Sequence, residues 1–266
     1  MKRELPESLE SRLEGFSFLE VKLEMSGAKV FKLEDRNETL FLKFAPISSD
    51  PDPAFSIQAE ADRLKWLRSK KLAVPKIEML LEHRGLEYLL MTAIPGRDAS
   101  QPWPSDQIPS IIAKLAAGLR TWHDTNTNDC PYQLSLVTRI AQARARTQNT
   151  GLKLELEALL EHTPKHEDLV LCHGDPCVPN VLLNDDLEIS GWIDLGRAGV
   201  MDRHWDLALI VGSLEMDLNP QFNGWSEYFL EAYGLDFSTR QFEVAKRGDL
   251  VLRYFSHEIT QSPRSS

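Results

Sequence analysis

The feature that most constrains this chain is a polar motif followed by a predicted β-hairpin. A His-Gly-Asp stretch ends at Asp175, and Asn180 follows within the same short loop. Two apolar stretches come next, residues 181–183 and 188–194, with a polar Asn-Asp-Asp turn between them. Such a pattern predicts a hairpin, and its last residue is Asp194. Because a hairpin brings its two ends together, we expect Asn180 and Asp194 to lie near one site.

Asp175, Asn180 and Asp194 carry the oxygen atoms that phosphoryl transfer from a nucleotide requires. A carboxylate must orient the acceptor hydroxyl and take its proton, and Asp175 fits this role. Carboxylate and carboxamide oxygens hold Mg²⁺ on the phosphates, so Asn180 and Asp194 are the candidate metal ligands. Any one of these residues alone could be a turn or capping residue. Their joint spacing across a hairpin favours phosphoryl-transfer chemistry.

The first third of the sequence alternates between strand-like stretches and one helical segment. Short apolar runs between polar turns predict strands at residues 16–23, 29–33, 39–44, 74–81 and 87–92. Apolar residues at helical spacing predict a helix over residues 55–67. The Ile-Pro-Gly sequence at residues 94–96 then breaks the pattern, where a connector between lobes would lie. From residue 108 onward the pattern is helical, most clearly over residues 108–123.

The composition limits which binding partners and which cellular compartment are expected for this chain. The chain has 266 residues, enough for one large domain or two lobes, and we expect two lobes. A net charge of −10 argues against general binding to nucleic acid or anionic membranes and would attract a polycation, although solubility alone could explain it. No stretch suits a signal peptide or a membrane span, so we expect a cytoplasmic protein. The three cysteines, Cys130, Cys172 and Cys177, lack zinc-site spacing and should be reduced thiols.

The motif resembles the signature of aminoglycoside phosphotransferases, particularly the 3′ and 3″ types, which share the protein-kinase fold. The resemblance is carried by His173, Asp175, Asn180, the stretch Ile193-Asp194-Leu195-Gly196-Arg197, Asp202, Asp206, residues 25–33, and Cys130-Pro131-Tyr132 soon after His123. It implies an α+β, two-lobed protein-kinase-like fold. Residues 1–94 would form a small antiparallel-sheet lobe that binds nucleotide. Residues 95–266 would form a larger, mostly helical lobe for catalysis and substrate binding.

By this resemblance, Lys43 would hold the α- and β-phosphates of the nucleotide, and Glu60 on the following helix would pair with it. The sequence pattern supports the same pairing without the resemblance. A lysine that ends an apolar strand needs a partner, and Glu60 lies on the first helix that could supply one. The alternative is a surface lysine beside a solvated helix face.

The resemblance also implies the other contacts to the nucleotide. Ser26 and neighbouring amides would cover the β-phosphate, although a single glycine, Gly27, makes this a weak phosphate loop by itself. Phe41 would stack on the base, or it could be a core residue of its strand. The backbone around Ala93 and Ile94 would read the base edge. The donor would be ATP or GTP, with Mg²⁺ as the cofactor.

The implied acceptor is an aminoglycoside, whose ammonium groups need carboxylates as partners. Glu215, Asp217 and Glu258 are the candidates by resemblance, and each could be an ordinary surface acid. Arg197 could neutralise phosphate charge or hold acidic groups of the acceptor site in place. Residues 139–167 are shorter than the acidic insertion of the 3′ enzymes, so the substrate range could differ. The sequence leaves open the 3′-hydroxyl of kanamycin or neomycin and the 3″-hydroxyl of streptomycin.

The expected activity is therefore transfer of a γ-phosphoryl group to an aminoglycoside, which would give antibiotic resistance. The alternatives are a kinase of another hydroxylated metabolite and a nucleotide-binding regulatory module without turnover. A metal hydrolase built on His173 and Asp175 would need further histidines at ligand spacing, which the sequence lacks. A monomer or a homodimer is compatible with each of these.

Overall fold

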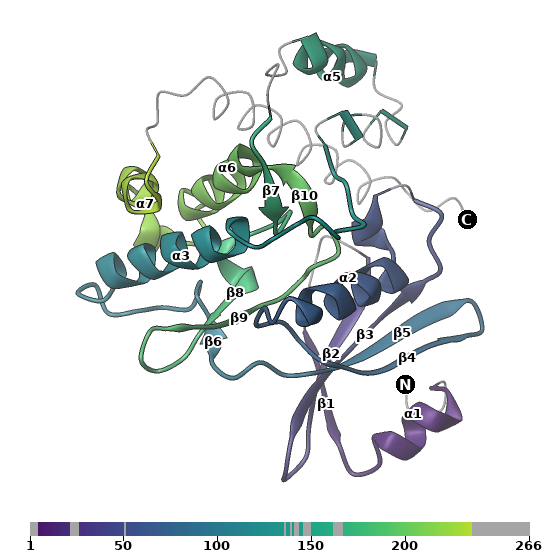
Figure 1. Cartoon of the computed structure of the whole chain (residues 1–266). Coiled ribbons are helices and arrows are strands. Elements are labelled where there is room, and N and C mark those ends of the chain that lie inside the picture. Colours follow the sequence, from purple (N-terminus) through teal and green to yellow (C-terminus); the bar gives the residue numbers. More distant parts are fainter. Residues whose placement is uncertain are drawn as a thin grey trace.

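The computed structural model describes residues 5–21, 27–50, 52–135, 137–138, 140, 144–145, 150–161 and 167–235. These residues form two lobes (Figure 1), a small one built on an antiparallel sheet and a larger one made mostly of helices. The predicted α+β, two-lobed architecture is confirmed.

The small lobe consists of one five-stranded sheet and two α-helices. The strands pair in the order β1-β2-β3-β5-β4, and all neighbours are antiparallel. The elements are α1 (Glu7–Arg12), β1 (Ser17–Val21), β2 (Lys29–Glu34), β3 (Thr39–Pro46), η2 (Pro53–Phe55), α2 (Ile57–Ser69), β4 (Ile77–His83) and β5 (Leu86–Thr92). Strand β4 begins three residues later than predicted. Pro75 has no N–H for the ladder, and the N–H of Lys76 donates to the Thr92 side chain (3.0 Å).

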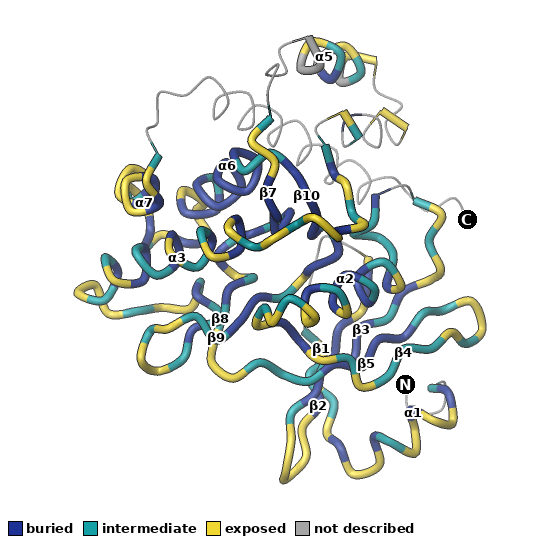
Figure 2. Tube along the Cα trace, viewed as in Figure 1, coloured by how far each residue is buried: buried dark blue, intermediate teal, exposed yellow. Residues whose placement is uncertain are grey.

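Strand β3 separates two environments, because successive side chains of a strand point to opposite faces. On one face, Leu40 and Leu42 are buried in a cluster with Leu9 and Leu13 of the α1 region. On the other face Lys43 points towards α2, and it is also buried. Buried and partly buried positions alternate along much of β3 (Figure 2). The strand thus delivers a lysine into the interior from a sheet that is otherwise stabilised by apolar packing.

Helix α2 begins after Ser56, whose hydroxyl accepts a hydrogen bond from the N–H of Ala59 (3.1 Å). Serine at this position satisfies an N–H that has no partner within the helix. The buried residues Ile57 and Leu64 join a hydrophobic cluster that continues into the large lobe. Glu60, in the first turn, is buried as well. The helix therefore holds an acidic side chain in the interior at a position set by packing.

Residues 93–96 connect the two lobes. Gly96 has a φ of +109°, and a Cβ atom there would lie 2.3 Å from the carbonyl oxygen of Leu183, so only glycine fits. Strand β6 (Arg97–Asp98) follows at once and pairs with β8. The connector therefore leads directly to the predicted hairpin.

The large lobe contains helices around two small sheets, β10-β7 and β6-β8-β9. Its other elements are α3 (Ile108–His123), α5 (Thr150–Glu161), β7 (Leu169–Cys172), η3 (Val178–Asn180), β8 (Val181–Leu183), β9 (Ile189–Trp192), β10 (Gly199–Asp202), α6 (Arg203–Leu214), η4 (Pro220–Phe222) and α7 (Ser226–Tyr233). Helix α3 has the predicted bounds. The hairpin ends at Trp192, earlier than expected, because Asp194 has a left-handed backbone (φ +60°) that a strand cannot include.

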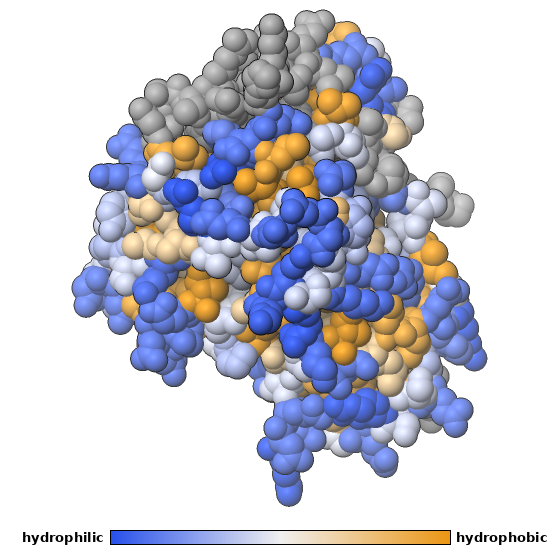
Figure 3. Space-filling model, viewed as in Figure 1, coloured by the Kyte–Doolittle hydropathy of each residue, from blue (hydrophilic) through white to orange (hydrophobic). Residues whose placement is uncertain are grey.

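The described residues bury two hydrophobic clusters, and the larger one runs from α2 into α3, α6 and α7. Packing at this shared core joins the two lobes. The visible surface of the described part is mainly hydrophilic, with smaller hydrophobic patches (Figure 3). Among the described helices, none has the length and apolar character needed to cross a bilayer.

Candidate active site

Lys43 forms a buried ion pair at the boundary between the lobes. Its Nζ atom lies 2.6 Å from Oε2 of Glu60 and 3.1 Å from Oδ1 of Asp194. The side chains of Lys43 and Glu60 are 8% and 6% exposed, whereas that of Asp194 is 51% exposed. Burial lowers the pKa of Lys43, but the carboxylates of Asp194 and Glu60 outweigh burial and raise it above its ordinary value. The lysine is therefore a fixed cation, able to bind phosphate oxygens.

Asp194 lies at the open end of the hairpin, close to Asn180. The N–H of Ile193 donates to the carbonyl oxygen of Asn180 (3.0 Å), which continues the pairing beyond β8 and β9. The charge of Lys43 is the largest influence on Asp194 and lowers the pKa of its carboxyl. Asp194 is consequently ionised at neutral pH, and about half of its side chain remains accessible to a ligand.

Asp175 lies between β7 and η3, in a loop that Asn180 closes. The side-chain amide of Asn180 donates to the backbone carbonyl oxygen of Asp175 (2.9 Å). On the Asp175 carboxylate, Oδ1 accepts a hydrogen bond from the thiol of Cys177 (2.8 Å), and Oδ2 lies 3.9 Å from Nη1 of Arg197. Its side chain is 28% exposed. The structure therefore brings Asp175 and Asn180 together, with the Asp175 carboxylate held between a thiol and a guanidinium.

Asp206 of α6 supports this loop from inside the large lobe. Its fully buried carboxylate accepts hydrogen bonds from the N–H groups of His173 (2.6 Å) and Gly174 (2.9 Å). Gly174 has a φ of +85°, and a Cβ atom there would lie 2.3 Å from the carbonyl oxygen of Arg197. The loop is thus fixed through its backbone, and only glycine permits its close contact with residue 197.

His173 packs between two tryptophan rings inside the large lobe. It is fully buried, and its ring lies 5.2 Å from that of Trp122 and 5.4 Å from that of Trp192. Burial lowers the pKa of His173, so the ring is neutral at pH 7. Its Nδ1 accepts a hydrogen bond from the N–H of Asp175 (3.3 Å), which further orders the loop.

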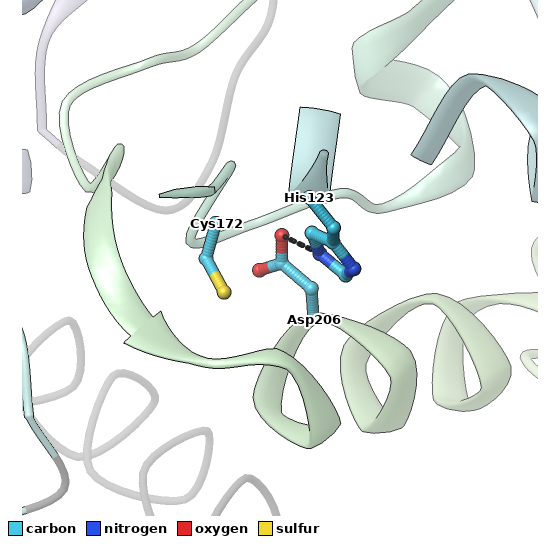
Figure 4. A group of neighbouring side chains, drawn as sticks. All are labelled: His123, Cys172 and Asp206. Carbon is cyan, nitrogen blue, oxygen red and sulfur yellow. Dashed lines mark hydrogen bonds and ion pairs between the residues drawn. The ribbon is translucent and has the colours of Figure 1, made fainter. Parts of the chain in front are cut away.

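His123, Cys172 and Asp206 form a buried group beside this support (Figure 4), with possible ligand atoms within 4.8 Å of one another. Nδ1 of His123 lies 2.6 Å from the hydroxyl of Tyr233, and the thiol of Cys172 donates to the carbonyl oxygen of Met201 (3.5 Å). Burial raises the pKa of Cys172 well above its ordinary value. Nε2 of His123 lies 3.4 Å from Oδ2 of Asp206, and Asp206 binds the N–H groups of His173 and Gly174. The group thus supports the Asp175 loop through Asp206.

Three candidate nucleotide-binding residues lie in β3 and in the connector that follows β5. Phe41 precedes Lys43 by two positions in β3, so their side chains share one face of the sheet. The N–H of Ala93 donates to the carbonyl oxygen of Thr39 (3.1 Å). Within the described part of the chain, the carbonyl of Ala93 and the N–H of Ile94 have no hydrogen-bond partner. The connector therefore offers one acceptor and one donor.

The candidate acceptor-binding residues, Glu215, Asp217 and Glu258, do not form a cluster of contacts like that around Lys43 among the described residues. Glu215 ends α6, and its carboxylate accepts a hydrogen bond from the hydroxyl of Ser226 at the start of α7. This contact joins the two helices. Asp217 is exposed. Glu258 and the nucleotide candidate Ser26 lie outside the described residues.

Sequence reasoning did not identify two residues that touch the site, Asp52 and Cys177. Nη2 of Arg197 lies 2.9 Å from Oδ2 of Asp52. In the sequence, Asp52 stands between two prolines, a pattern that indicates only a turn. Cys177 stands two positions after Asp175, and no local pattern predicts that its thiol faces the carboxylate. The Asp52 contact depends on tertiary packing, and the Cys177 contact depends on the loop conformation, which the sequence does not show.

Asn180 and Asp194 have the chemistry of a Mg²⁺ site. Mg²⁺ prefers oxygen ligands and is commonly held by one or two protein side chains. The amide nitrogen of Asn180 is engaged by the loop, which leaves its carboxamide oxygen without a partner among the described residues. Asp194 contributes an ionised carboxylate at the same end of the hairpin. This donor set fits the ion.

Comparison with known proteins places the chain in a family. Residues 21–258 match the sequence pattern of the phosphotransferase enzyme family. An aminoglycoside 3'-phosphotransferase of Streptomyces fradiae is 36% identical over 228 residues, which cover 79% of this chain and 85% of the relative. Another, of Niallia circulans, is 34% identical over 248 residues, which cover 88% and 92%.

Among solved structures, a crystal structure of aminoglycoside-3'-phosphotransferase of type VIII superimposes with a TM-score of 0.79 at 30% identity. The match covers 92% of this chain and 96% of that one. The match thus extends over both lobes and the site between them. On the agreement of sequence pattern, relatives and fold, the chain belongs to the phosphotransferase enzyme family.

Proposed function

We propose that this chain is an ATP-dependent kinase that phosphorylates the 3′-hydroxyl of kanamycin-type or neomycin-type aminoglycosides and thereby confers resistance. The observation that carries the proposal is the meeting of Lys43, Glu60 and Asp194, contributed by both lobes, beside the loop of Asp175. The relatives that bear the name aminoglycoside 3'-phosphotransferase support the acceptor class and the hydroxyl.

In this proposal the small lobe binds the nucleotide. Lys43 binds the α- and β-phosphates, and Glu60 keeps its ammonium group in place. Phe41 stacks on the base from the same face of β3. The carbonyl of Ala93 accepts from the base, and the N–H of Ile94 donates to it. Ser26 and its neighbouring amides cover the β-phosphate, as a loop rich in N–H groups would.

Asp175 orients the acceptor hydroxyl and takes its proton as the phosphoryl group is transferred. Its partly exposed carboxylate on a braced loop supports this role, because a base must be both accessible and fixed. Asn180 and Asp194 would hold Mg²⁺, and the bound ion would neutralise charge on the phosphates. The base and the two ligands thus come from one loop and one hairpin.

The acceptor side uses acidic groups to bind a cation. Asp217, Glu215 and Glu258 are the proposed partners of the aminoglycoside ammonium groups, and the net charge of −10 favours approach of a polycation. Of the two roles considered for Arg197, its contacts favour the second, because the guanidinium lies between the carboxylates of Asp52 and Asp175.

A direct test is incubation of the chain with Mg²⁺, ATP and kanamycin, followed by mass spectrometry. The expected product is kanamycin heavier by one phosphoryl group, because the hydroxyl that faces Asp175 is the nucleophile. An aminoglycoside that lacks the 3′-hydroxyl is the matched control and should remain unmodified. Parallel reactions use GTP as the donor, and streptomycin or hydroxylated metabolites such as choline as the acceptor.

Phosphorylation of streptomycin but not kanamycin would contradict the 3′ assignment and support the 3″ one. Turnover on a metabolite with every aminoglycoside unmodified would overturn the substrate class while leaving the kinase assignment intact. Nucleotide binding without phosphorylation of any acceptor would support a regulatory module.

A further inference from the structure

Two arginines join the region of helix α2 to the loop that follows Asp194. The Nε atom of Arg63, in α2, donates to the carbonyl oxygen of Ala198 (2.9 Å) in a buried contact. The guanidinium of Arg197 binds Asp52, which precedes η2 in the small lobe. A Cβ atom on Gly196 would lie 3.1 Å from Cα of Ala54, so the two backbones are in close contact between these arginines. The contact fixes the small lobe against the loop beside the site.

Arg197 faces two carboxylates, and it holds them differently. Towards Asp52, Nη2 lies 2.9 Å from Oδ2, and Nε lies 3.3 Å from each carboxylate oxygen. Towards Asp175, Nη1 lies 3.9 Å from Oδ2, which exceeds hydrogen-bond length. Burial alone would lower the pKa of Arg197, but the carboxylates of Asp52, Asp175 and Asp194 together raise it above its ordinary value, with Asp52 contributing most. One edge of the guanidinium is therefore bound to Asp52, and the other only approaches Asp175.

Burial makes the Asp52 contact strong. Asp52 is 7% exposed, and the Arg197 side chain is 21% exposed. When an arginine and a carboxylate are both shielded from solvent, they favour a close, hydrogen-bonded pair. If Asp52 lost its charge, Asp175 would be the nearest remaining carboxylate recorded beside Arg197. A close pair there would occupy the oxygen that an acceptor hydroxyl needs.

We propose that Asp52 is a positioning residue for phosphoryl transfer, which acts by holding Arg197 back from the carboxylate of Asp175. The inference rests on the proposed function, in which Asp175 is the base. It adds that the small lobe controls the availability of that base, through a residue that is not among the proposed nucleotide contacts. Asp52 acts through Arg197 and touches neither reactant.

The test uses Asp52→Asn, because an amide can keep the local structure while removing the charge. Oδ1 of Asp52 accepts a hydrogen bond from the N–H of Ala54 (3.0 Å), and the asparagine oxygen can accept the same bond. We expect kcat to fall about tenfold, because the base is partly occupied, while KM for ATP changes less than about twofold. Tm should change little, because Arg197 would still have a carboxylate partner in Asp175.

Two further variants separate positioning from simple stability. Asp62→Asn removes the same charge from a half-exposed position on α2, where Asp62 binds Lys65, and should leave kcat unchanged. Arg197→Gln removes the group through which Asp52 acts, so adding Asp52→Asn to it should lower kcat no further.

Equal kcat for Asp52→Asn and the wild-type chain would overturn the inference, as would losses that simply multiply in the double variant. A fall in kcat that follows a large fall in Tm would make Asp52 structural and would overturn it too. These outcomes are distinct from failure of the proposed function, in which the wild-type chain itself phosphorylates no aminoglycoside.

Discussion

The Asp175→Asn variant should lose kcat by a factor on the order of 10² or more, while its affinity for the Mg²⁺-nucleotide stays within about twofold of wild type. Asparagine has the shape of aspartate but cannot take a proton from the acceptor hydroxyl. The loop should persist, because its support comes from backbone contacts. Asp206 accepts from the N–H groups of His173 and Gly174, and Asn180 donates to the carbonyl of residue 175.

Steady-state kinetics with a saturating aminoglycoside would measure kcat, and calorimetric titration would measure nucleotide affinity. Unchanged turnover in a folded variant would show that Asp175 is not the base. A loss of nucleotide affinity as large as the loss of turnover would instead assign Asp175 to binding.

The Asp194→Asn variant should also lose turnover, but through weaker binding of the Mg²⁺-nucleotide. Loss of the carboxylate removes a charged Mg²⁺ ligand, so affinity for the Mg²⁺-nucleotide should fall about tenfold or more, and kcat should fall by a factor on the order of 10² or more. Lys43 should remain charged and in place, because Glu60 binds it more closely, at 2.6 Å against 3.1 Å for Asp194. Titrating nucleotide with and without Mg²⁺ would measure the effect.

The matched control is Asp186→Asn, which removes the same charge from the exposed turn of the same hairpin. It should bind and turn over like wild type. Without Mg²⁺, Asp194→Asn should bind nucleotide at least as tightly as wild type, because the variant removes a negative charge beside the phosphates and leaves Lys43 paired with Glu60. Equal affinity in the presence of Mg²⁺ as well would contradict the assignment of Asp194 as a ligand.

The parts of the site that depend on local pattern could be predicted from the sequence. Asn180 and Asp194 meet because a hairpin joins them, and the apolar stretches around its turn are visible in the sequence. The pairing of Lys43 with Glu60 was also predictable, since α2 is the first α-helix after β3 and could supply a partner for a lysine in an apolar strand. The helix over residues 108–123 has a regular apolar period and the predicted bounds.

The remaining parts depend on contacts between distant residues. Asp52 and Arg197 are 145 positions apart, and nothing near either residue indicates the other. The sheet of β7 and β10 escaped prediction because each strand has only four residues and pairs across the whole motif. Asp194 ends the hairpin early through a left-handed backbone that an aspartate seldom adopts, so its pattern indicated a longer strand.

A crystal structure of the chain with Mg²⁺, a non-hydrolysable ATP analogue and kanamycin would test the proposed site most directly. The proposed site requires that Asn180 and Asp194 bind the metal, that Lys43 contacts the phosphates, and that the 3′-hydroxyl donates a hydrogen bond to Asp175. A metal bound without either ligand, or an Asp175 carboxylate turned away from every acceptor hydroxyl, would contradict it.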